Sequence, residues 1–587
     1  MTMIQRAGMN IHKTISNNIK SKLRDVPDIG AASVADILDN IVIEVPKVRD
    51  FGDFSTNIAM VLAKPLGKSP RDIANMLIPH INDIPEIKEV SIAGPGFINI
   101  KLKDEFIIKA GLAPLDISAQ AAPLKIDLDY GSYNVAKSLH IGHLRGGIIG
   151  DTFYRMAKFL GHKPVSYNHI GDWGRPMALV IAWIMKKFPN DWNKPDFKID
   201  ESEFNDYYPA ASAYSKENPE FLEQVLLIKK EFQDGRADYF ALYEKMLKIS
   251  LDQMSNVVRR LNMLPFDNTL GERNAAKYLG PVEEILRAKN LIEKDDGAEI
   301  IKLRRDEDNA PMPPYMWRDS RGADTYDSTD LAAMYYRKIT DNPDKIIYFS
   351  DYRQKLHFAQ LFRAAEISGV FPADKLEFPY FGGINGADGK PYKTRDGNVA
   401  GLLDIVQMVG DAARARVLEA GKNLPDETIE MIALAALKFN DLIHDMKSDY
   451  IFDADEVTNF EGRTGPYVLY TAVRLNSIIK KVNPDSIHHD GGAQIVSLHP
   501  DERGLLLMAA DFERIVNVAF DRRAPDVLAN YAYDLCQSIN TFYHSCPILR
   551  DDLSPAVRAH RFAIVEKSIE VLSRAIGLMG LNVPDKM

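Results

Sequence analysis

Hydrophobic and polar positions recur along the chain with periods that predict three regions of different architecture. In residues 1–110, a helical spacing from Ile11 to Leu23 and a short strand at Ile41 to Val45 precede a hairpin between Val90 and Ile100. We therefore expect an α+β N-terminal domain. The alanine- and proline-containing residues 111–123 are interpreted as a linker.

In residues 124–400, strand and helix patterns alternate. Apolar and polar residues alternate from Leu124 to Asp129, and a helical spacing follows from Leu144 to Leu160. Further strands are predicted at Pro164 to His169, Lys345 to Ser350 and Phe378 to Phe381. This order predicts a Rossmann-like parallel sheet with right-handed crossovers. Residues from about 185 to 320 are helical and charged in pattern, and we interpret them as a helical insertion.

From residue 401 the pattern is almost entirely helical. Residues 401–448 are interpreted as a helical connector and residues 449–587 as a separate all-α bundle. The long amphipathic stretches Tyr467 to Lys481 and Val527 to Phe542 support the bundle. The fold class expected for the whole chain is multidomain α/β.

Composition narrows the functional classes. The 587 residues are 46% hydrophobic and 26% charged, with a formal net charge of −10, which argues against unspecific coating of nucleic acid. An RNA partner stays possible because local basic patches decide binding. Only Cys536 and Cys546 occur, without metal-ligand spacing, so we expect no metal held by side chains and a reducing, cytoplasmic setting. With neither a bilayer-length apolar run nor a leader, we expect no membrane partner.

The tetrapeptide His140-Ile141-Gly142-His143 lies where the first strand of residues 124–400 passes into its helix. A helix N-terminus preceded by glycine attracts anions, because free N–H groups and the helix dipole face the ligand. Two imidazoles would add donors for phosphate, and Gly142 would let a nucleotide approach the backbone. Two histidines three apart are by themselves as often ordinary core or surface residues, but this position favours nucleotide binding.

Four further polar segments follow the predicted strands, where a parallel sheet forms its ligand crevice. They are residues 168–174, 324–332, 351–358 and 388–395. Together with the tetrapeptide, in this order, they resemble the class I aminoacyl-tRNA synthetases, and specifically the arginyl-tRNA synthetase family. The segments 52–60, 92–99, 464–467 and 583–587 also match that family, so the resemblance runs nearly from end to end.

The resemblance implies ATP-dependent ligation of L-arginine to tRNA(Arg) through an arginyl-adenylate, with release of AMP and pyrophosphate. It also implies Mg²⁺ with the nucleotide, activation that depends on bound tRNA, and a monomer. The arginine carboxylate is already ionised at pH 7, so the reaction needs no general base. Positioning and charge neutralisation at phosphorus are then the tasks of the site.

The resemblance assigns ATP to the tetrapeptide and to later segments. It implies ATP contacts from His140, Gly142, His143, Gly171, Asp172 and Lys393. The implied catalytic residues are His140, His143, Lys137, Lys393 and Arg395. Lys137 would supply a cation for the α-phosphate, while Lys393 and Arg395 would hold the leaving pyrophosphate. Without the family register, a loop lysine would be interpreted as a solvated charge.

Arginine requires other groups, because its guanidinium is planar and permanently charged and is best bound by carboxylates and a polar ring. Asp129, Tyr326 and Asp330 match the family positions for that task, and Asn134 and Gln354 match those for the α-groups. The family has glutamate where this chain has the shorter Asp129, so a direct contact requires a tighter pocket or a bridging water. On its own, such an aspartate would be interpreted as a helix cap or a surface carboxylate.

For tRNA, the resemblance implies contacts of the helical bundle with the anticodon and of the N-terminal domain with the tRNA elbow. Tyr467, Tyr470, Arg474 and Met587 match the anticodon positions, where unstacked bases would lie on aromatic rings. Core packing is the alternative for the two tyrosines, which are three apart. Two other functions stay open: a paralogue that binds tRNA without catalysis, and a class I synthetase for another amino acid.

Overall fold

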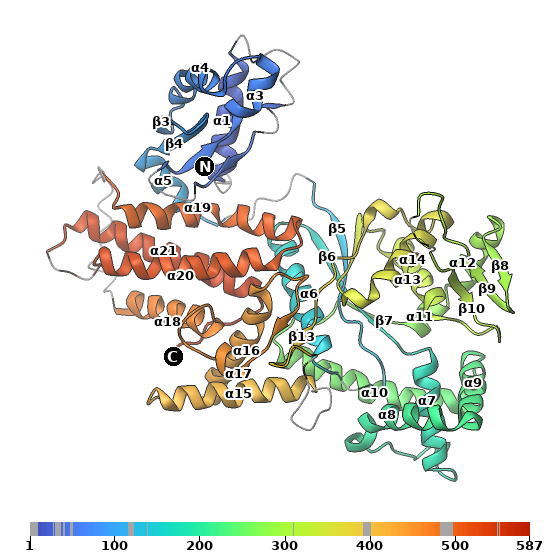
Figure 1. Ribbon diagram of the computed structural model, residues 1–587. Coiled ribbons are helices and arrows are strands. Elements are labelled where there is room, and N and C mark those ends of the chain that lie inside the picture. Colours follow the sequence, from blue (N-terminus) through green and yellow to red (C-terminus); the bar gives the residue numbers. More distant parts are fainter. Residues whose placement is uncertain are drawn as a thin grey trace, which may run out of the picture.

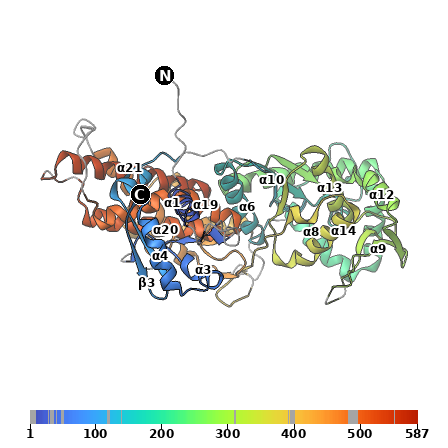
Figure 2. The ribbon, with the colours of Figure 1, turned by 90° about the horizontal axis from the view of Figure 1, so that it is seen from above.

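The computed structural model shows an N-terminal domain, a central α/β domain with an insertion, and a helical bundle (Figure 1). It describes residues 10–26, 29, 37–38, 41–46, 51–115, 122–137, 139–308, 310, 312–390, 392, 401–481, 497–548, 550 and 552–587. Seen from above, the bundle and the central α/β domain lie side by side (Figure 2). None of the helices in this described part of the chain is both long and apolar enough to cross a lipid bilayer.

The N-terminal domain packs helices against a four-stranded antiparallel sheet of order β1-β2-β4-β3. Helix α1 (Ile11–Arg24) buries one apolar stripe, as its spacing predicts. The hairpin is also present, with strands β3 (Ile87–Ala93) and β4 (Phe97–Leu102). The remaining elements are β1 (Ile43–Glu44), β2 (Phe54–Thr56), α3 (Ile58–Leu66), α4 (Pro70–Asn82) and α5 (Asp104–Gly111).

The central α/β domain is built on a parallel sheet of order β12-β11-β5-β6-β7. Its strands are β5 (Lys125–Asp129), β6 (Lys163–Ile170), β7 (Asn268–Gly271), β11 (Lys345–Tyr348) and β12 (Leu376–Glu377). The helices that follow them are α6 (Gly142–Phe159), α7 (Arg175–Lys187), α11 (Glu272–Ala276), α12 (Leu279–Ala288), α13 (Tyr326–Thr340) and α14 (Lys355–Ser368). The predicted strand at Phe378 to Phe381 is displaced, because pairing with β11 ends at Glu377.

The region predicted as a helical insertion, about 185–320, is more varied than its pattern suggested. Its first part is helical, with α8 (Glu201–Glu217), α9 (Pro219–Gln233) and α10 (Ala237–Arg260). It then contributes β7, the edge strand of the main sheet, and a separate antiparallel sheet of β8 (Ile292–Asp295), β9 (Ala298–Ile301) and β10 (Tyr315–Arg318). These strands are four residues long each, too short for a periodic signal.

The helical bundle includes the predicted connector. Helices α15 (Leu402–Glu419) and α16 (Asp426–Ile443) share one hydrophobic core with the later helices. Those are α18 (Gly465–Lys481), α19 (Pro500–Asp521), α20 (Pro525–Ser545) and α21 (Pro555–Leu578). The short strands β13 (Ile384–Asn385) and β14 (Tyr450–Ile451) pair in parallel beside helix α17 (Ala454–Val457).

Helix α6 connects the sheet to the bundle through a buried ion pair. The Nε of Arg145 lies 2.9 Å from Oδ1 of Asp441 on α16, and both side chains are almost completely buried. The same guanidinium donates from Nη1 to the carbonyls of Gly382 at 2.8 Å and Ser448 at 3.0 Å. Such a pair is stable only while both partners are present.

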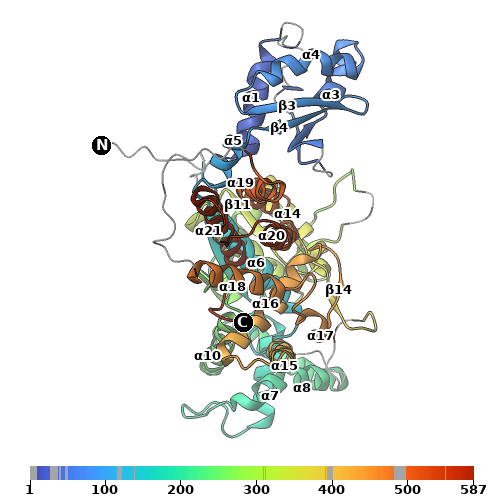
Figure 3. The same ribbon diagram turned by 90° about the vertical axis from the view of Figure 1, so that its left-hand side faces the viewer.

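The N-terminal domain rests on α19 (Figure 3). Arg503 of α19 donates from Nε to Asp53 at 2.9 Å, pairs with Asp104, and donates to the carbonyl of Leu102 at 2.7 Å. One guanidinium therefore holds a strand end and a helix start of that domain together.

Candidate active site

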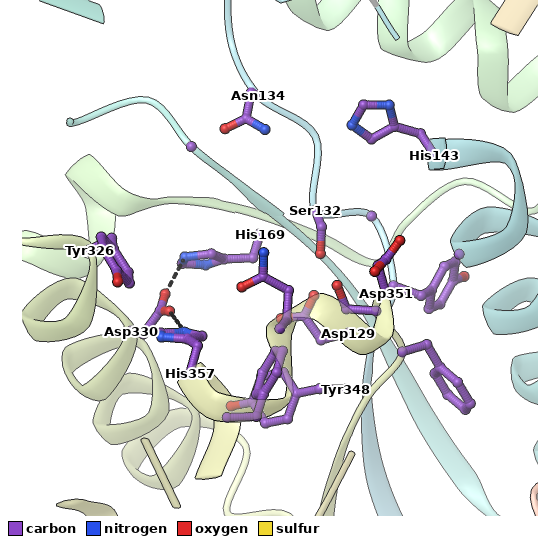
Figure 4. A pocket seen from close by; sticks show the side chains of 18 of the residues that line it. Asp129, Ser132, Asn134, His143, His169, Tyr326, Asp330, Tyr348, Asp351 and His357 are labelled. Atoms are coloured by element: carbon purple, nitrogen blue, oxygen red, sulfur yellow. Dashed lines mark hydrogen bonds and ion pairs between the residues drawn. The ribbon is translucent and has the colours of Figure 1, made fainter. Parts of the chain in front are cut away.

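A cavity of about 570 Å³ opens at the carboxyl ends of strands β5, β6 and β11, where a parallel sheet is expected to bind ligands. Nine residues predicted from the sequence line it: Asp129, Asn134, His140, Gly142, His143, Gly171, Tyr326, Asp330 and Gln354. His143 and Asp330 lie at opposite ends of this pocket (Figure 4). The structure thus brings together residues from five segments of the chain.

The histidine turn, residues 140–143, begins α6. Nδ1 of His140 accepts a hydrogen bond from the N–H of Gly142 at 3.0 Å, and Nδ1 of His143 accepts from the N–H of His140 at 3.1 Å. In a neutral imidazole the other nitrogen, Nε2, then carries the proton and is a donor. Burial lowers the pKa of His140 and lowers the pKa of His143 to about 3. Both rings are therefore neutral donors at pH 7.

The backbone N–H groups in the first turn of α6, which the sequence suggested would be free to bind an anion, already have hydrogen-bond partners within the turn. The N–H of Gly142 is bonded to the His140 ring, and the N–H of His143 donates to the carbonyl of His140 at 2.8 Å. The imidazoles therefore replace the free amides as the donors offered to a ligand.

The loop before the histidine turn has an unusual backbone. Ser132 and Ala136 have φ of 48° and 59°, in the left-handed region that costs free energy for residues other than glycine. Asn134 lies between them and bridges to Gly171. A Cβ on Gly171 would lie 2.3 Å from Oδ1 of Asn134, so glycine is required for this approach.

At the other end of the cavity, Asp330 stands between two imidazoles; we call His169, Asp327, Asp330 and His357 the Asp330 cluster. Nε2 of His169 lies 3.0 Å from Oδ1 of Asp330, and Nε2 of His357 lies 2.7 Å from Oδ2. Nδ1 of His357 is also 3.3 Å from Oδ1 of Asp327. Although burial opposes it, contact with both histidines lowers the pKa of Asp330, so the carboxylate is charged.

Tyr326 begins the helix that carries Asp330. The side chain of Thr325 caps α13 through the N–H of Ser328. Tyr326 and Asp330 then share one helix face, as their spacing predicts, and both line the cavity. Tyr326 is 63% exposed, and its ring centre is 5.2 Å from that of His357. An open phenol ring beside a carboxylate suits a planar cation.

Asp129 lines the same cavity but has a partner within the protein. Its carboxylate pairs with the buried guanidinium of Arg337 on α13. That guanidinium lies 4.2 Å from the ring centre of Tyr167 and 5.4 Å from that of Tyr348. A ligand at Asp129 would have to share the carboxylate with Arg337, so direct contact of Asp129 with arginine stays a prediction.

Two predicted residues lie outside the cavity. The ammonium of Lys137 is 4.5 Å from the ring centre of Tyr208 on α8, which attracts a cation. The buried carboxylate of Asp172 accepts hydrogen bonds from the Tyr243 hydroxyl at 2.7 Å and the Arg273 N–H at 3.0 Å. Asp172 therefore fixes the end of β6 to neighbouring helices. Lys393 and Arg395 lie outside the described residues, and their roles stay predictions.

Several lining residues had no assigned role in the sequence. They are His169, Glu272, Arg337, Arg353 and His357. His169 and His357 belong to polar segments that the sequence had singled out, so position was a usable signal for them. Burial raises the pKa of Glu272 to about 7, and its Oε2 accepts from the N–H of Trp173 at 3.1 Å. Arg353 donates from Nε to Asp351 at 2.8 Å.

A second cavity, of about 490 Å³, lies in the helical bundle. All four residues predicted to contact tRNA line it: Tyr467, Tyr470, Arg474 and Met587. The Tyr467 hydroxyl accepts from Asn540 at 2.8 Å and Gln537 at 3.0 Å, which fixes that ring. Tyr470 is 39% exposed and offers the more open ring for stacking.

Comparison with known proteins identifies the family. Residues 9–102 match the arginyl tRNA synthetase N-terminal domain, residues 116–454 the catalytic domain of class I tRNA synthetases (R), and residues 468–587 the DALR anticodon binding domain. A protein named arginine–tRNA ligase from Alkaliphilus oremlandii is 36% identical over 559 residues, covering 92% of this chain and 94% of that protein. The chain belongs to the arginyl-tRNA synthetase family.

Other similarities agree with this membership. The arginine–tRNA ligase of Agathobacter rectalis is 34% identical over 568 residues, covering 92% of this chain and 94% of its own. The crystal structure of arginyl-tRNA synthetase from Plasmodium falciparum has the same fold, with a TM-score of 0.81 at 23% identity, over 99% of this chain and all of that one. The predicted family, fold class and enzyme class are therefore confirmed.

Proposed function

We propose that this protein ligates L-arginine to tRNA(Arg) with ATP, through an arginyl-adenylate, and releases AMP and pyrophosphate. The main support for this proposal is that the two ends of the active-site cavity offer different chemical groups. A single cavity has neutral imidazole donors at one end and a charged carboxylate beside an open tyrosine at the other. The first end suits phosphate, and the second suits a guanidinium.

In the first step, a carboxylate oxygen of arginine attacks the α-phosphorus of ATP, and pyrophosphate leaves with the electrons of the broken P–O bond. The nucleophile is ionised, so no proton is transferred. His140 and His143 stabilise the developing phosphoryl charge through Nε2–H, with adenosine against Gly142 and Gly171. In the second step, the 2′-hydroxyl oxygen of the terminal tRNA adenosine attacks the carbonyl carbon. The bond from this carbon to the phosphate oxygen breaks, AMP leaves with its electrons, and the hydroxyl proton passes to solvent.

Arginine lies across the cavity in this proposal. Its guanidinium faces Tyr326 and Asp330, and its α-groups face Asn134 and Gln354. Lys393 and Arg395 hold pyrophosphate, and Lys137 reaches the α-phosphate after leaving the Tyr208 ring. Placing both reactants in one cavity converts the encounter into an intramolecular step, which removes a large part of the barrier.

For tRNA, we infer that the bundle cavity receives an anticodon base. Tyr470 stacks on it, Tyr467 and Met587 form the wall, and Arg474 meets the phosphate backbone. Tyr470→Phe keeps a stacking ring, whereas Tyr470→Ala removes it. We expect only the second to weaken tRNA binding, by about 1–3 kcal/mol, in a filter-binding titration. Equal losses of tRNA affinity in both variants would show that the hydroxyl group of Tyr470, and not its ring, makes the contact.

Mg²⁺, a monomeric state and a cytoplasmic location complete the proposal. Mg²⁺ on a nucleotide is held mostly by phosphate oxygens and water, with one or two protein carboxylates. Among the described residues, no group of three or more His, Cys, Asp or Glu side chains is arranged so that it could hold a metal ion by itself. Light scattering of the purified chain tests the monomer, and exchange activity titrated with Mg²⁺ tests the metal.

The decisive experiment is ATP–pyrophosphate exchange with arginine, with and without tRNA, and with other amino acids as controls. Exchange with arginine only in the presence of tRNA is expected. Exchange without tRNA would keep the ligase and remove the tRNA-dependent activation. Exchange with another amino acid in place of arginine would identify that amino acid as the substrate. No exchange at all would favour a tRNA-binding protein without catalysis.

A further inference from the structure

The carboxylate proposed to bind the arginine guanidinium is already occupied on both oxygens. Oδ1 of Asp330 is 3.0 Å from His169, and Oδ2 is 2.7 Å from His357 (Figure 4). A guanidinium prefers to bind a carboxylate through two parallel N–H···O bonds. Each carboxylate oxygen has a second acceptor site, so the charge of the surroundings decides whether arginine binds beside the two imidazoles or in place of one.

The two histidines differ in what else they contact. His357 has a second carboxylate, Asp327, 3.3 Å from its Nδ1. Nδ1 of His169 is buried and has no hydrogen-bond partner among the described residues. His169 therefore depends on Asp330 alone for a strong partner to its positive charge, whereas His357 would keep Asp327.

Charge balance in the Asp330 cluster points the same way. Two carboxylates face two imidazoles, so the cluster is neutral when both rings are protonated. A guanidinium would add an uncompensated positive charge in a confined space, which is costly. The other ionisable groups that face His169 come from β5, the turn after β6, α11 and α13: Asp129, Asp172, Glu272 and Arg337. Arg337 is matched by Asp129. Burial raises the pKa of Glu272 to about 7 and also raises that of Asp172, which weakens both carboxyl groups as counter-charges for a guanidinium.

The pKa values agree with this geometry. Burial alone would lower the pKa of His169, but its contact with Asp330 raises it above the ordinary value. The pKa of His357 is raised to about 10 despite burial, by Asp327 and Asp330. His357 therefore stays charged near neutral pH, and His169 is the ring whose charge depends on access to Asp330.

We propose that His169 is a proton-releasing positioning residue, and that the arginine guanidinium replaces it on Asp330 while His169 loses its proton to solvent. The inference rests on the proposed function, because it takes Asp330 as the guanidinium site. It also supplies a basis for specificity. Citrulline has nearly the shape of arginine but no charge, so it cannot replace the imidazolium on Asp330 with a matching cation.

The sign of the pH dependence follows from linkage. At a pH below both the free and the arginine-bound pKa of His169, the ring is protonated in both states and nothing is released. Between the two values, one proton leaves on binding, and arginine affinity rises about tenfold for each pH unit. Above the free-state pKa, affinity no longer changes with pH.

Isothermal titration calorimetry with arginine, on the full chain with tRNA and without ATP, measures this directly. Titrations in buffers of different ionisation enthalpy give the number of protons released. We expect a value approaching one within the window, and none with citrulline. His169→Gln should bind arginine without release and without the pH slope. His357→Gln and Glu272→Gln, which remove the other two candidate proton sources in the cavity, should retain release.

Each outcome has a defined meaning. Arginine binding by the wild-type protein without proton release overturns the inference and leaves the proposed function intact. Release that persists in His169→Gln but disappears in His357→Gln or Glu272→Gln also overturns it, because the proton would come from another group. If His169→Gln does not fold, retention of release in both His357→Gln and Glu272→Gln still assigns the proton to His169, and its loss in either variant overturns the inference. No arginine binding by the wild-type protein would instead contradict the proposed function.

Discussion

The two ends of the active-site cavity each contain a pair of histidines, and the two environments shift the pKa values of these pairs in opposite directions. His140 and His143 accept backbone N–H groups at Nδ1, and burial keeps them neutral. His169 and His357 face the carboxylate of Asp330, which raises the pKa of both rings although burial opposes it. The same side chain is thus a neutral donor for phosphate at one end and a counter-charge at the other. Local partners, not residue type, decide the chemistry.

The largest effect is expected from substituting Arg337, whose buried guanidinium pairs with Asp129 at the end of β5. Arg337→Leu leaves a buried carboxylate without its cation, and we expect the free energy of unfolding to fall by about 3–5 kcal/mol. Denaturant titration followed by circular dichroism measures it. The double variant Asp129→Asn/Arg337→Leu removes both charges and should recover most of the loss. Unchanged stability in Arg337→Leu would show that the pair contributes nothing.

The neutral end is tested by His143→Ala, which removes a donor aimed at phosphate. We expect the turnover number for exchange to fall by about a hundredfold or more, with little change in the KM for arginine. His143→Gln restores an N–H near the position of Nε2 and should recover part of the rate. Equal losses in both variants would attribute the effect to packing of the ring.

The opposite pattern is expected for Asp330→Asn, which keeps the shape of the side chain and removes its charge. The KM for arginine should rise by about ten- to a hundredfold, because a charged hydrogen bond is lost. The turnover number and the KM for ATP should change much less. A large fall in turnover at saturating arginine would place Asp330 in the chemical step and weaken the separation of the two ends.

The smallest effect is expected for pH, because the rate of ATP–pyrophosphate exchange should not change through titration of His140 or His143. Because burial lowers the pKa of His140 and His143, these rings protonate only in more acidic solution than an ordinary histidine. Exchange at saturating arginine and ATP should therefore not fall through a group with a pKa near 6.5 between about pH 6 and 8. Such a fall in wild type that disappears in His143→Gln would show that this histidine is charged.

The comparison also explains what the sequence could predict. The histidine turn is local, so its residues and its strand-to-helix setting were predictable from one segment. The partners of Asp330 lie on β6 and α14, and only the fold brings them to α13. Nothing near Asp129 in the chain indicates Arg337. Strand β7 was missed because four residues between helices carry no clear period.

Long elements were predicted well because their apolar positions repeat many times. Helix α1 begins at the predicted residue, and strand β6 differs by one residue at each end. The boundary placed between the connector and the bundle stays a prediction. Helix α16 packs against α18 and α20 as well as α15, and the apolar pattern of one helix does not reveal which neighbour covers it.

The ion pair between Arg145 and Asp441 has a consequence for how this molecule can be divided. Arg145 belongs to the helix that starts with the histidine turn, whereas Asp441 belongs to the bundle. A fragment ending before α16 would keep the whole parallel sheet but leave a guanidinium in an apolar interior with no counter-ion. The catalytic sheet is therefore not a transferable module. Any recombination or truncation that keeps it must also keep α16 or supply another acid at the same place.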